Sequence, residues 1–232
     1  MGKAIERFAL ARGHEVVARI DIDNAQDFDS DAFRSADVAI EFTTPLTAAA
    51  NCRKALERGV RVVSGSTGWA AAMPEVKALC ESLGGTMLWS SNYSIGVNIF
   101  MAVNRYLARL MAQLPDYRPS MTEIHHVHKL DHPSGTAITL AEGIIASDPA
   151  VKAWTEEAAD ADGSTMLISH RREGEVPGTH IVSWDSPVDT ITIEHAAKSR
   201  DGFALGAVMA AEWVRGERGW LTMDMFMNQF IS

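Results

Sequence analysis

Residues 123–137, EIHHVHKLDHPSGTA, hold four of the chain's eight histidines together with a lysine. Histidine titrates near neutral pH and a nearby ammonium group shifts that titration, so a His–Lys pair suits proton donation to an atom that gains electrons. If residues 120–129 form a strand, His125 and Lys129 share one face, and His126 and His128 share the other. The spacing therefore predicts a proton donor and a second cation on one face, which is chemistry that a reduction requires.

The residues after this basic run predict an anion-binding pocket. Pro133, Ser134, Gly135 and Thr136 stand at the start of TAITLAEG, which has a helical pattern. Unpaired backbone N–H groups, hydroxyls and the helix dipole would attract a carboxylate or a phosphate there. Ordinary capping and solvated histidines explain each residue alone, but their combination favours a binding site.

A metal site on His126 and His128 is a second interpretation of the same run. Two histidines on one face still need a third ligand, and the chain has no HExxH element or cysteine cluster that would supply a pattern. Cys52 and Cys80 lie in separate predicted helices, so we expect both to be reduced, as in a cytoplasmic protein. We therefore expect no metal.

The overall composition excludes several classes of protein. The 232 residues include 21 basic and 30 acidic side chains, and the net charge of -9 argues against a general nucleic-acid surface. Apolar residues at 47% and charged residues at 22% are typical of one or two globular domains. With no signal-peptide pattern and no apolar run of roughly 20 residues, we expect neither export nor membrane insertion.

The N-terminal part of the chain alternates helical and strand-like segments. Helices are predicted at 3–13, 44–59 and 74–84, and strands at 15–21, 37–43, 60–68 and 86–96. This alternation predicts a parallel sheet with its ligands at the carboxyl ends of the strands.

Beyond Gly96 this alternation stops. Helices are predicted at 97–114, 136–147, 203–216 and 221–230, a looser segment at 148–163, and strands at 120–129, 165–173, 179–185 and 189–199. Strands without long helices between them indicate an open mixed or antiparallel sheet. The last two helices are free to fold back onto the first domain.

Polar and small residues at successive strand ends predict a groove for a nucleotide. Asp21 ends the segment 15–21, where an acid binds ribose hydroxyls in nucleotide-binding folds. The other candidates are Phe42, Thr43, Gly65, Ser66, Thr67, Ser90, Ser91, Asn92 and Tyr93. Each alone fits a turn or a helix cap, but their shared position at strand ends favours a site.

These stretches together resemble the dihydrodipicolinate reductases, the 4-hydroxy-tetrahydrodipicolinate reductases of lysine and diaminopimelate biosynthesis. The resemblance covers nearly the whole chain and is most specific in EIHHVHKLDHPSGTA, with support from EFTTP, GSTG, SSNYSIGVN and VPGTH. It implies an α/β fold, with a Rossmann-like dinucleotide-binding domain at residues 1–93 and 204–232. Residues 94–203 would form an α+β domain for substrate binding and tetramerisation, built on an open mixed sheet.

The resemblance also implies hydride transfer from NADH or NADPH to a cyclic imine dicarboxylate, in a cytoplasmic homotetramer. His125 would donate and accept the proton, with Lys129 as a second proton donor. The substrate would contact His126, Ser134, Gly135 and Thr136. The cofactor would contact the candidates named above, from Asp21 to Tyr93.

The chain departs from the family pattern at two places. It begins at Met1-Gly2-Lys3, which resembles the end of the family's phosphate loop, so we expect the first strand and the G-x-G-x-x-G motif to be missing. Their absence should expose apolar edges and weaken cofactor binding. Ile22 follows Asp21 where some members carry an arginine for a 2′-phosphate, which favours NADH over NADPH.

Two other functions remain open at this point. A nicotinamide-dependent dehydrogenase of another small acid would act on simple keto acids instead of the cyclic imine. A catalytically silent assembly or binding subunit would fail to bind NADH unless the chain were extended upstream.

Overall fold

The computed structural model describes residues 1–231, which form two compact units. One unit contains Met1–Ile95 and the chain from Asp201 onward, and the other contains Gly96–Arg200. Among the helices of the described residues, none is both long and apolar enough to cross a membrane.

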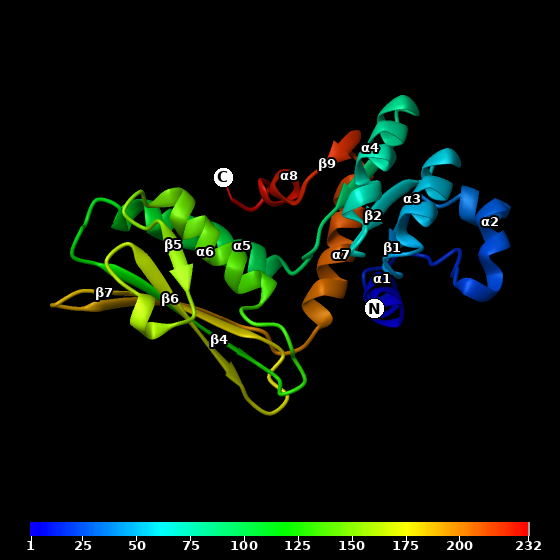
Figure 1. The fold of residues 1–232 in the computed structure, drawn as a ribbon. Coiled ribbons are helices and arrows are strands. Elements are labelled where there is room, and N and C mark those ends of the chain that lie inside the picture. The colour runs from blue at the N-terminus through cyan, green and yellow to red at the C-terminus, as the bar shows by residue number, and fades with distance from the viewer. Residues whose placement is uncertain (232) are drawn as a thin grey trace. The chain divides into compact units, whose positions relative to one another are not determined.

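The first unit is built on a parallel sheet of four strands (Figure 1). Its order is β1 (Val38–Glu41), β2 (Arg61–Ser64), β3 (Thr86–Trp89) and β9 (Gly219–Leu221). The register pairs Glu41 with Ser64 and Ser64 with Trp89, so the carboxyl ends of the first three strands are level. This alignment brings the loops that follow them to one edge of the sheet.

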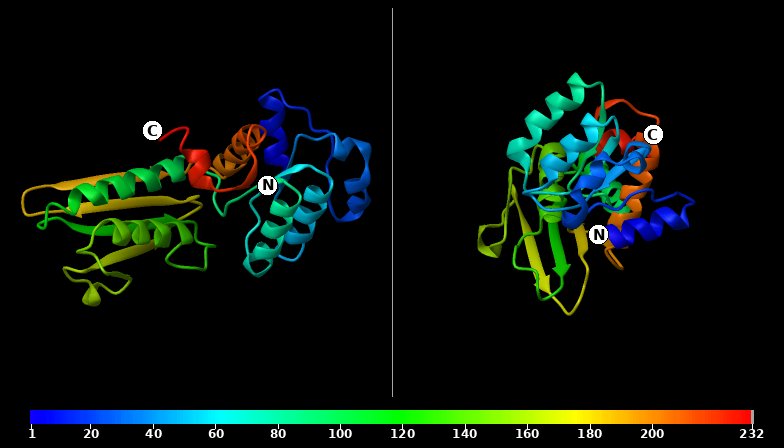
Figure 2. Two further views of the ribbon diagram at one scale, coloured as in Figure 1. Left: turned by 90° about the horizontal axis from the view of Figure 1, so that it is seen from above. Right: turned by 90° about the vertical axis from the view of Figure 1, so that its right-hand side faces the viewer.

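Helices cover both faces of this sheet, as the predicted alternation requires (Figures 1 and 2). On one face lie α3 (Ala48–Glu57) and α4 (Met73–Ser82), and on the other α1 (Gly2–Ala11) and α7 (Asp201–Val214). Gly13, Gly59 and Gly84 have φ of 84°, 75° and 60°, so each ends a helix in the conformation that glycine adopts at least cost. The unit also contains α2 (Asp31–Arg34), α8 (Met223–Met227) and 3-10 segments at Ile22–Asp29 and Ala70–Ala72.

The strand predicted at residues 15–21 is wrong. The segment is irregular, although Val16, Ala18 and Ile20 still pack toward the core. A strand is stabilised by the hydrogen-bond ladder to its neighbour. In the described part of the chain, β1 is the edge strand and only β2 pairs with it, so residues 15–21 form no ladder with this sheet.

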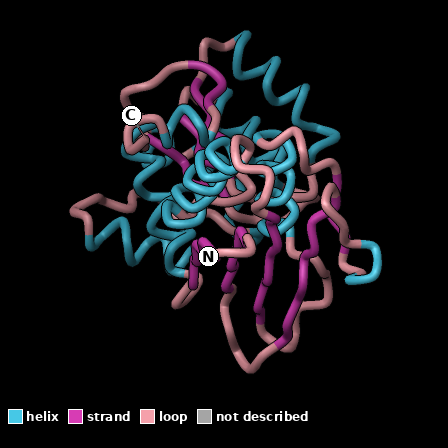
Figure 3. Tube along the Cα trace, turned by 90° about the vertical axis from the view of Figure 1, so that its left-hand side faces the viewer, coloured by secondary structure: helices cyan, strands magenta, loops and turns pink. Residues whose placement is uncertain are grey.

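The second unit is built on a mixed sheet of five strands, which Figure 3 draws in magenta. Its order is β5 (Ala153–Thr155), β6 (Thr165–Arg172), β4 (Arg118–His125), β7 (Thr179–Asp185) and β8 (Thr190–Ala196). The central strand β4 runs parallel to β6 and antiparallel to β7. The predicted open mixed sheet is therefore confirmed.

One face of this sheet is covered by α5 (Ile95–Met111) and α6 (Gly135–Ser147) (Figure 1). Apolar side chains of both helices pack there against Met121, Ile168 and Trp184. Every second side chain of a strand points to the opposite face, and such residues, for example Ile181 and Thr192, are partly or fully exposed. A 3-10 segment, Ala158–Asp160, lies between β5 and β6.

The strand predicted at 120–129 ends early, at His125. Its neighbour β6 also ends there, because Arg172 is the residue paired with His125. One further bond joins the two segments, from the Val127 N–H to the carbonyl of Gly174 at 3.1 Å. The chain then turns, and the Lys129 N–H donates to the carbonyl of His126 at 3.1 Å. The prediction that strand alternation places Lys129 on the same face as His125 is therefore wrong.

Candidate active site

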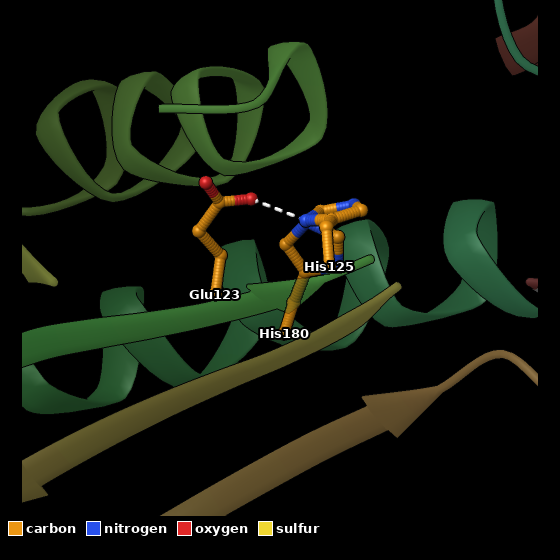
Figure 4. Close-up of side chains that lie close together, drawn as sticks. All are labelled: Glu123, His125 and His180. Carbon is orange, nitrogen blue, oxygen red and sulfur yellow. Dashed lines mark ion pairs between the residues drawn. The ribbon is translucent and has the colours of Figure 1, made fainter. Parts of the chain in front are cut away.

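Three titratable side chains meet at one end of the helix-covered face of the second unit (Figure 4). Glu123 and His125 lie on β4, and His180 lies on the adjacent strand β7. Nδ1 of His125 is 2.6 Å from Oε2 of Glu123. The rings of His125 and His180 pack edge to face, with 5.2 Å between their centroids.

Glu123 is fully buried and lies against the imidazole of its neighbour His125. Burial alone would raise the pKa of Glu123, but contacts with His125, Ser134 and Arg172 outweigh it and lower that pKa to about 2. The carboxylate is therefore an anion at neutral pH and can only accept hydrogen bonds. It lies against Nδ1 of His125, which leaves Nε2 as the ring nitrogen that can contact a ligand.

Gly178 lies against Nε2 of His125. Its φ is +148°, and a Cβ at this position would be 2.9 Å from Nε2 of His125. A side chain there would displace the imidazole, so a glycine is required. Sequence analysis singled out VPGTH only as part of a resemblance and assigned Gly178 no role.

Ser134, the first residue of the predicted anion pocket at Ser134–Thr136, lies beside this cluster. The Ser134 hydroxyl accepts from the Ala137 N–H at 3.2 Å, which confirms it as the cap of α6, and it is 3.0 Å from Nε2 of His180. No atom lies within 4 Å of the point where Gly135 would carry a Cβ. The start of α6 is thus uncrowded at Gly135, and the first turn of a helix is where backbone N–H groups can bind a carboxylate.

The buried His180 should make the protein less stable as the pH falls. Burial and the charge of His125 lower the pKa of His180 to about 4, whereas an unfolded histidine titrates near pH 6.5. Between these pH values His180 is protonated in the unfolded chain but neutral in the folded chain. The free energy of unfolding therefore falls by up to about 3 kcal/mol on going from pH 6.5 to 4.

Urea denaturation at several pH values in this range measures the effect. In His180→Gln the unfolding midpoint should fall less steeply with decreasing pH than in the unsubstituted protein. Glu123 does not mask the difference, because stability from its lowered pKa is lost only below about pH 4.5. Equal pH slopes in the two proteins would contradict the assignment.

Arg172 connects Lys129 to the buried carboxylate. Nη2 of Arg172 donates to Oε1 of Glu123 at 3.0 Å and to the carbonyl of Asp131 at 2.8 Å, and its Nε donates to the carbonyl of Lys129 at 3.2 Å. Nζ of Lys129 itself pairs with the carboxylate of Asp131 at 2.7 and 2.8 Å. The charge of Lys129 still contributes to lowering the pKa of His180.

His126 and His128 lie in a neighbouring pocket of about 380 Å³. The pocket is completed by Glu175, Pro177 and Arg200, and Nε2 of His128 is 2.9 Å from Oε1 of Glu175. Arg200 is a cation that sequence analysis missed. Within residues 1–231, these two histidines belong to no compact group of three metal-ligating side chains.

The first unit has a second pocket, of about 180 Å³, at the carboxyl ends of β1 and β2. Five of the predicted cofactor residues come together there. The lining residues are Met1, Phe42, Thr43, Pro45, Gly65, Ser66 and Thr67.

Glu41 organises this second pocket, although sequence analysis gave it no role. It is 7% exposed, and its carboxylate accepts from the hydroxyls of Ser64 at 2.6 Å and Ser66 at 2.8 Å. It also accepts from the backbone N–H and the hydroxyl of Thr43, at 2.8 and 2.6 Å. The loops after β1 and β2 are thus held together, with small polar groups at the strand ends, which is where doubly wound sheets generally place their ligands.

The remaining predicted cofactor residues do not line this pocket. Asp21 is exposed and caps a 3-10 segment by accepting from the Ile22 N–H at 2.8 Å. Tyr93 is 1% exposed, and its hydroxyl donates to the carbonyls of Ser64 at 2.9 Å and Leu88 at 3.1 Å. The structure thus gives the Tyr93 side chain a packing role between β2 and β3.

Ser90, Ser91 and Asn92 form the loop that follows β3. The Ser90 hydroxyl donates to the carbonyl of Asn92 at 3.0 Å, and the Asn92 side chain accepts from the Ser94 N–H at 2.9 Å. These bonds are the turn chemistry weighed above as the simpler interpretation. The loop nevertheless lies at the same edge of the sheet as the pocket, because β2 and β3 run parallel.

Comparison with known proteins matches both parts of the chain to one family. Residues 1–93 match the family description "Dihydrodipicolinate reductase, N-terminus", and residues 96–227 match "Dihydrodipicolinate reductase, C-terminus". A 4-hydroxy-tetrahydrodipicolinate reductase from Christiangramia forsetii is 42% identical, with 98% of this chain and 96% of the relative covered. One from Archaeoglobus fulgidus is 35% identical at the same coverages.

The fold is also found in a solved structure. A dipicolinate-bound dihydrodipicolinate reductase from Paenisporosarcina sp. TG-14 superposes with a TM-score of 0.75 at 19% sequence identity. The match covers 95% of this chain and 92% of that one.

Proposed function

The chain belongs to the dihydrodipicolinate reductase family, and from this premise we propose how its two pockets share the reaction. It is a nicotinamide-dependent oxidoreductase that reduces 4-hydroxy-tetrahydrodipicolinate in lysine and diaminopimelate biosynthesis. The second unit binds the cyclic dicarboxylate and exchanges protons with it, and the first unit binds the dinucleotide.

The Glu123–His125 pair beside the start of α6 carries this proposal. The backbone N–H groups of Gly135 and Thr136 hold one substrate carboxylate, as the open space at Gly135 allows. Nε2 of His125 exchanges a proton with the ring, while Glu123 stabilises the charge on the imidazole.

Lys129 supplies a second proton, and His126 contacts the substrate from its neighbouring pocket. The carboxylate of Asp131 holds the ammonium group of Lys129 in place. The ammonium of Lys129 and the positive end of α6 suit a ligand with two negative charges, because each carboxylate then has its own positive partner.

The dinucleotide would lie against Phe42, Thr43, Gly65, Ser66 and Thr67, and when bound it supplies the hydride. We propose that Asp21 and the loop Ser90–Tyr93 complete this site. We also propose a preference for NADH: Ile22 follows Asp21, and the nearby Arg19 is engaged by Glu6, so neither supplies a cation for a 2′-phosphate.

Following NADH absorbance with the purified protein tests the proposed reaction. We expect oxidation of NADH that depends on the cyclic imine, with a higher kcat/KM for NADH than for NADPH. Pyruvate and other simple keto acids should give no turnover, since they lack the second carboxylate. Turnover of a keto acid but not of the imine would overturn the assignment, and equal use of NADPH would overturn the cofactor preference alone.

We propose a homotetramer that assembles through the open sheet face of the second unit. Ile181, Thr192 and Glu194 lie on that face and are partly or fully exposed. Symmetric pairing with another copy would cover such a surface. Sedimentation at the mass of four chains is the expected result, and a monomer at micromolar concentration would contradict it.

A further inference from the structure

Three metal-ligating side chains meet outside the cluster proposed for catalysis. His132 precedes the start of α6, Glu156 follows β5, and His170 lies on β6. Nδ1 of His132 is 2.9 Å from Oε1 of Glu156, and Nδ1 of His170 is 3.0 Å from the same oxygen. The two imidazoles are stacked, with 4.1 Å between their centroids and 19° between their planes.

As neutral rings, both imidazoles can donate from Nδ1 to this oxygen. Protonating both rings would place two positive charges in a stack. A cation would instead accept a lone pair from each nitrogen and from the oxygen. We propose that His132, Glu156 and His170 bind one divalent transition-metal ion of the Zn²⁺ class.

The distances fit such an ion. A tetrahedral Zn²⁺ with its usual bonds of about 2.1 Å holds neighbouring ligand atoms about 3.4 Å apart. The two observed N···O distances need to open by about 0.4–0.5 Å, and the three ligand atoms already lie within 4.8 Å of one another. The two stacked rings must also rotate so that both Nδ1 lone pairs point at the ion. Two imidazoles and one carboxylate suit Zn²⁺ or Co²⁺ better than Mg²⁺ or Ca²⁺.

The electrostatic surroundings also permit a cation. Among the described residues, Glu156 forms ion pairs with these two rings alone. Arg172 lies two residues from His170, but its charge is balanced by Glu123. The three side chains are 24–50% exposed, so an ion can enter and a water molecule can take the fourth position.

The buried group of Glu123, His125 and His180 has the same ligand types but is a poorer metal site. Glu123 is already paired with Arg172, and Nε2 of His180 contacts the Ser134 hydroxyl. A divalent ion there would face Arg172 and Lys129 without an exposed path for hydration. We therefore assign the ion to the exposed group.

Metal titration of the full-length protein, stripped with a chelator, tests the proposal. Calorimetry with ZnCl₂ should give one site per chain, and Co²⁺ should produce the visible absorption of a tetrahedral complex. Removing a ligand in Glu156→Gln should weaken binding by more than about 100-fold, because even an outer hydrogen-bond partner of a metal ligand is worth 10- to 100-fold. Because Glu156→Gln preserves side-chain size, this variant still tests the proposal if the histidine variants fail to fold.

Two histidine variants locate the site. His132→Ala/His170→Ala should lose the bound ion, whereas His128→Ala, which removes a different surface His–Glu pair, should keep it. Circular dichroism checks that each variant is folded. Absence of a stoichiometric site in the unsubstituted protein would overturn the proposal. So would a site that survives the double substitution or disappears in His128→Ala.

Discussion

Replacing His125 by Asn and Lys129 by Met should abolish turnover while the protein still binds NADH. Loss of a positioned proton donor lowers kcat by about 10²- to 10⁴-fold, and the double variant loses both of the proposed donors. The dinucleotide pocket belongs to the first unit, so its affinity should not change. Steady-state kinetics with the cyclic imine and NADH fluorescence titration measure the two effects separately.

Lys152→Met provides the matched control for the charge change. Lys152 lies in the same unit, is exposed and is outside both pockets. Its loss should leave kcat and NADH binding near those of the unsubstituted protein. Full turnover in the His125/Lys129 double variant would show that the reaction does not need these two side chains. Loss of NADH binding together with turnover would show that the substitutions act through folding.

Gly206→Ala should prevent the first unit from folding. A Cβ at Gly206 in α7 would lie 1.7 Å from the carbonyl oxygen of Tyr93, far inside any contact distance. Tyr93 cannot move away easily, because its hydroxyl is bonded to the carbonyls of Ser64 and Leu88. We expect a loss of stability of more than about 4 kcal/mol, seen as a low urea midpoint or as insoluble protein.

Gly202→Ala is the control on the same helix. The nearest atom to a Cβ there is the Ser94 hydroxyl oxygen at 3.4 Å, an ordinary contact. Because alanine favours helix by up to about 1 kcal/mol over glycine, the midpoint should stay the same or rise slightly. If both variants unfold alike, the close approach of α7 to Tyr93 is not the cause.

The alternating part of the fold was predictable because its signals are local. The sequence predicts the helices that end at Gly13, Gly59 and Gly84 and the apolar strands β1, β2 and β3. The capping role of Ser134 followed from its place before a helical pattern. Each of these features depends on neighbouring residues alone.

The elements that the sequence did not predict correctly depend on pairing between segments that are distant in the chain. Residues 15–21 have strand-like composition but no ladder partner, while β5 and β9 have only three residues each and exist because a sheet edge accepts them. The start of the helix predicted at 221–230 is instead the last residue of β9. Composition within a short window cannot reveal either outcome.

The same limit applies to the candidate sites. His125 and Lys129 were found because they stand close together in the sequence, but Arg172 meets Glu123 only through the pairing of β4 with β6. Glu41 likewise meets Ser64 and Ser66 through the pairing of β1 with β2. An isolated arginine or glutamate gives no sign of such a role before the strands are aligned.

The position of Arg172 opposite His125 limits how the gene can change in length. Inserting or deleting one codon within β6 would turn Arg172 to the other side of the sheet and separate it from Glu123. Insertions and deletions should therefore be tolerated in residues 157–164, between the two strands at that edge, and removed by selection from residues 165–172.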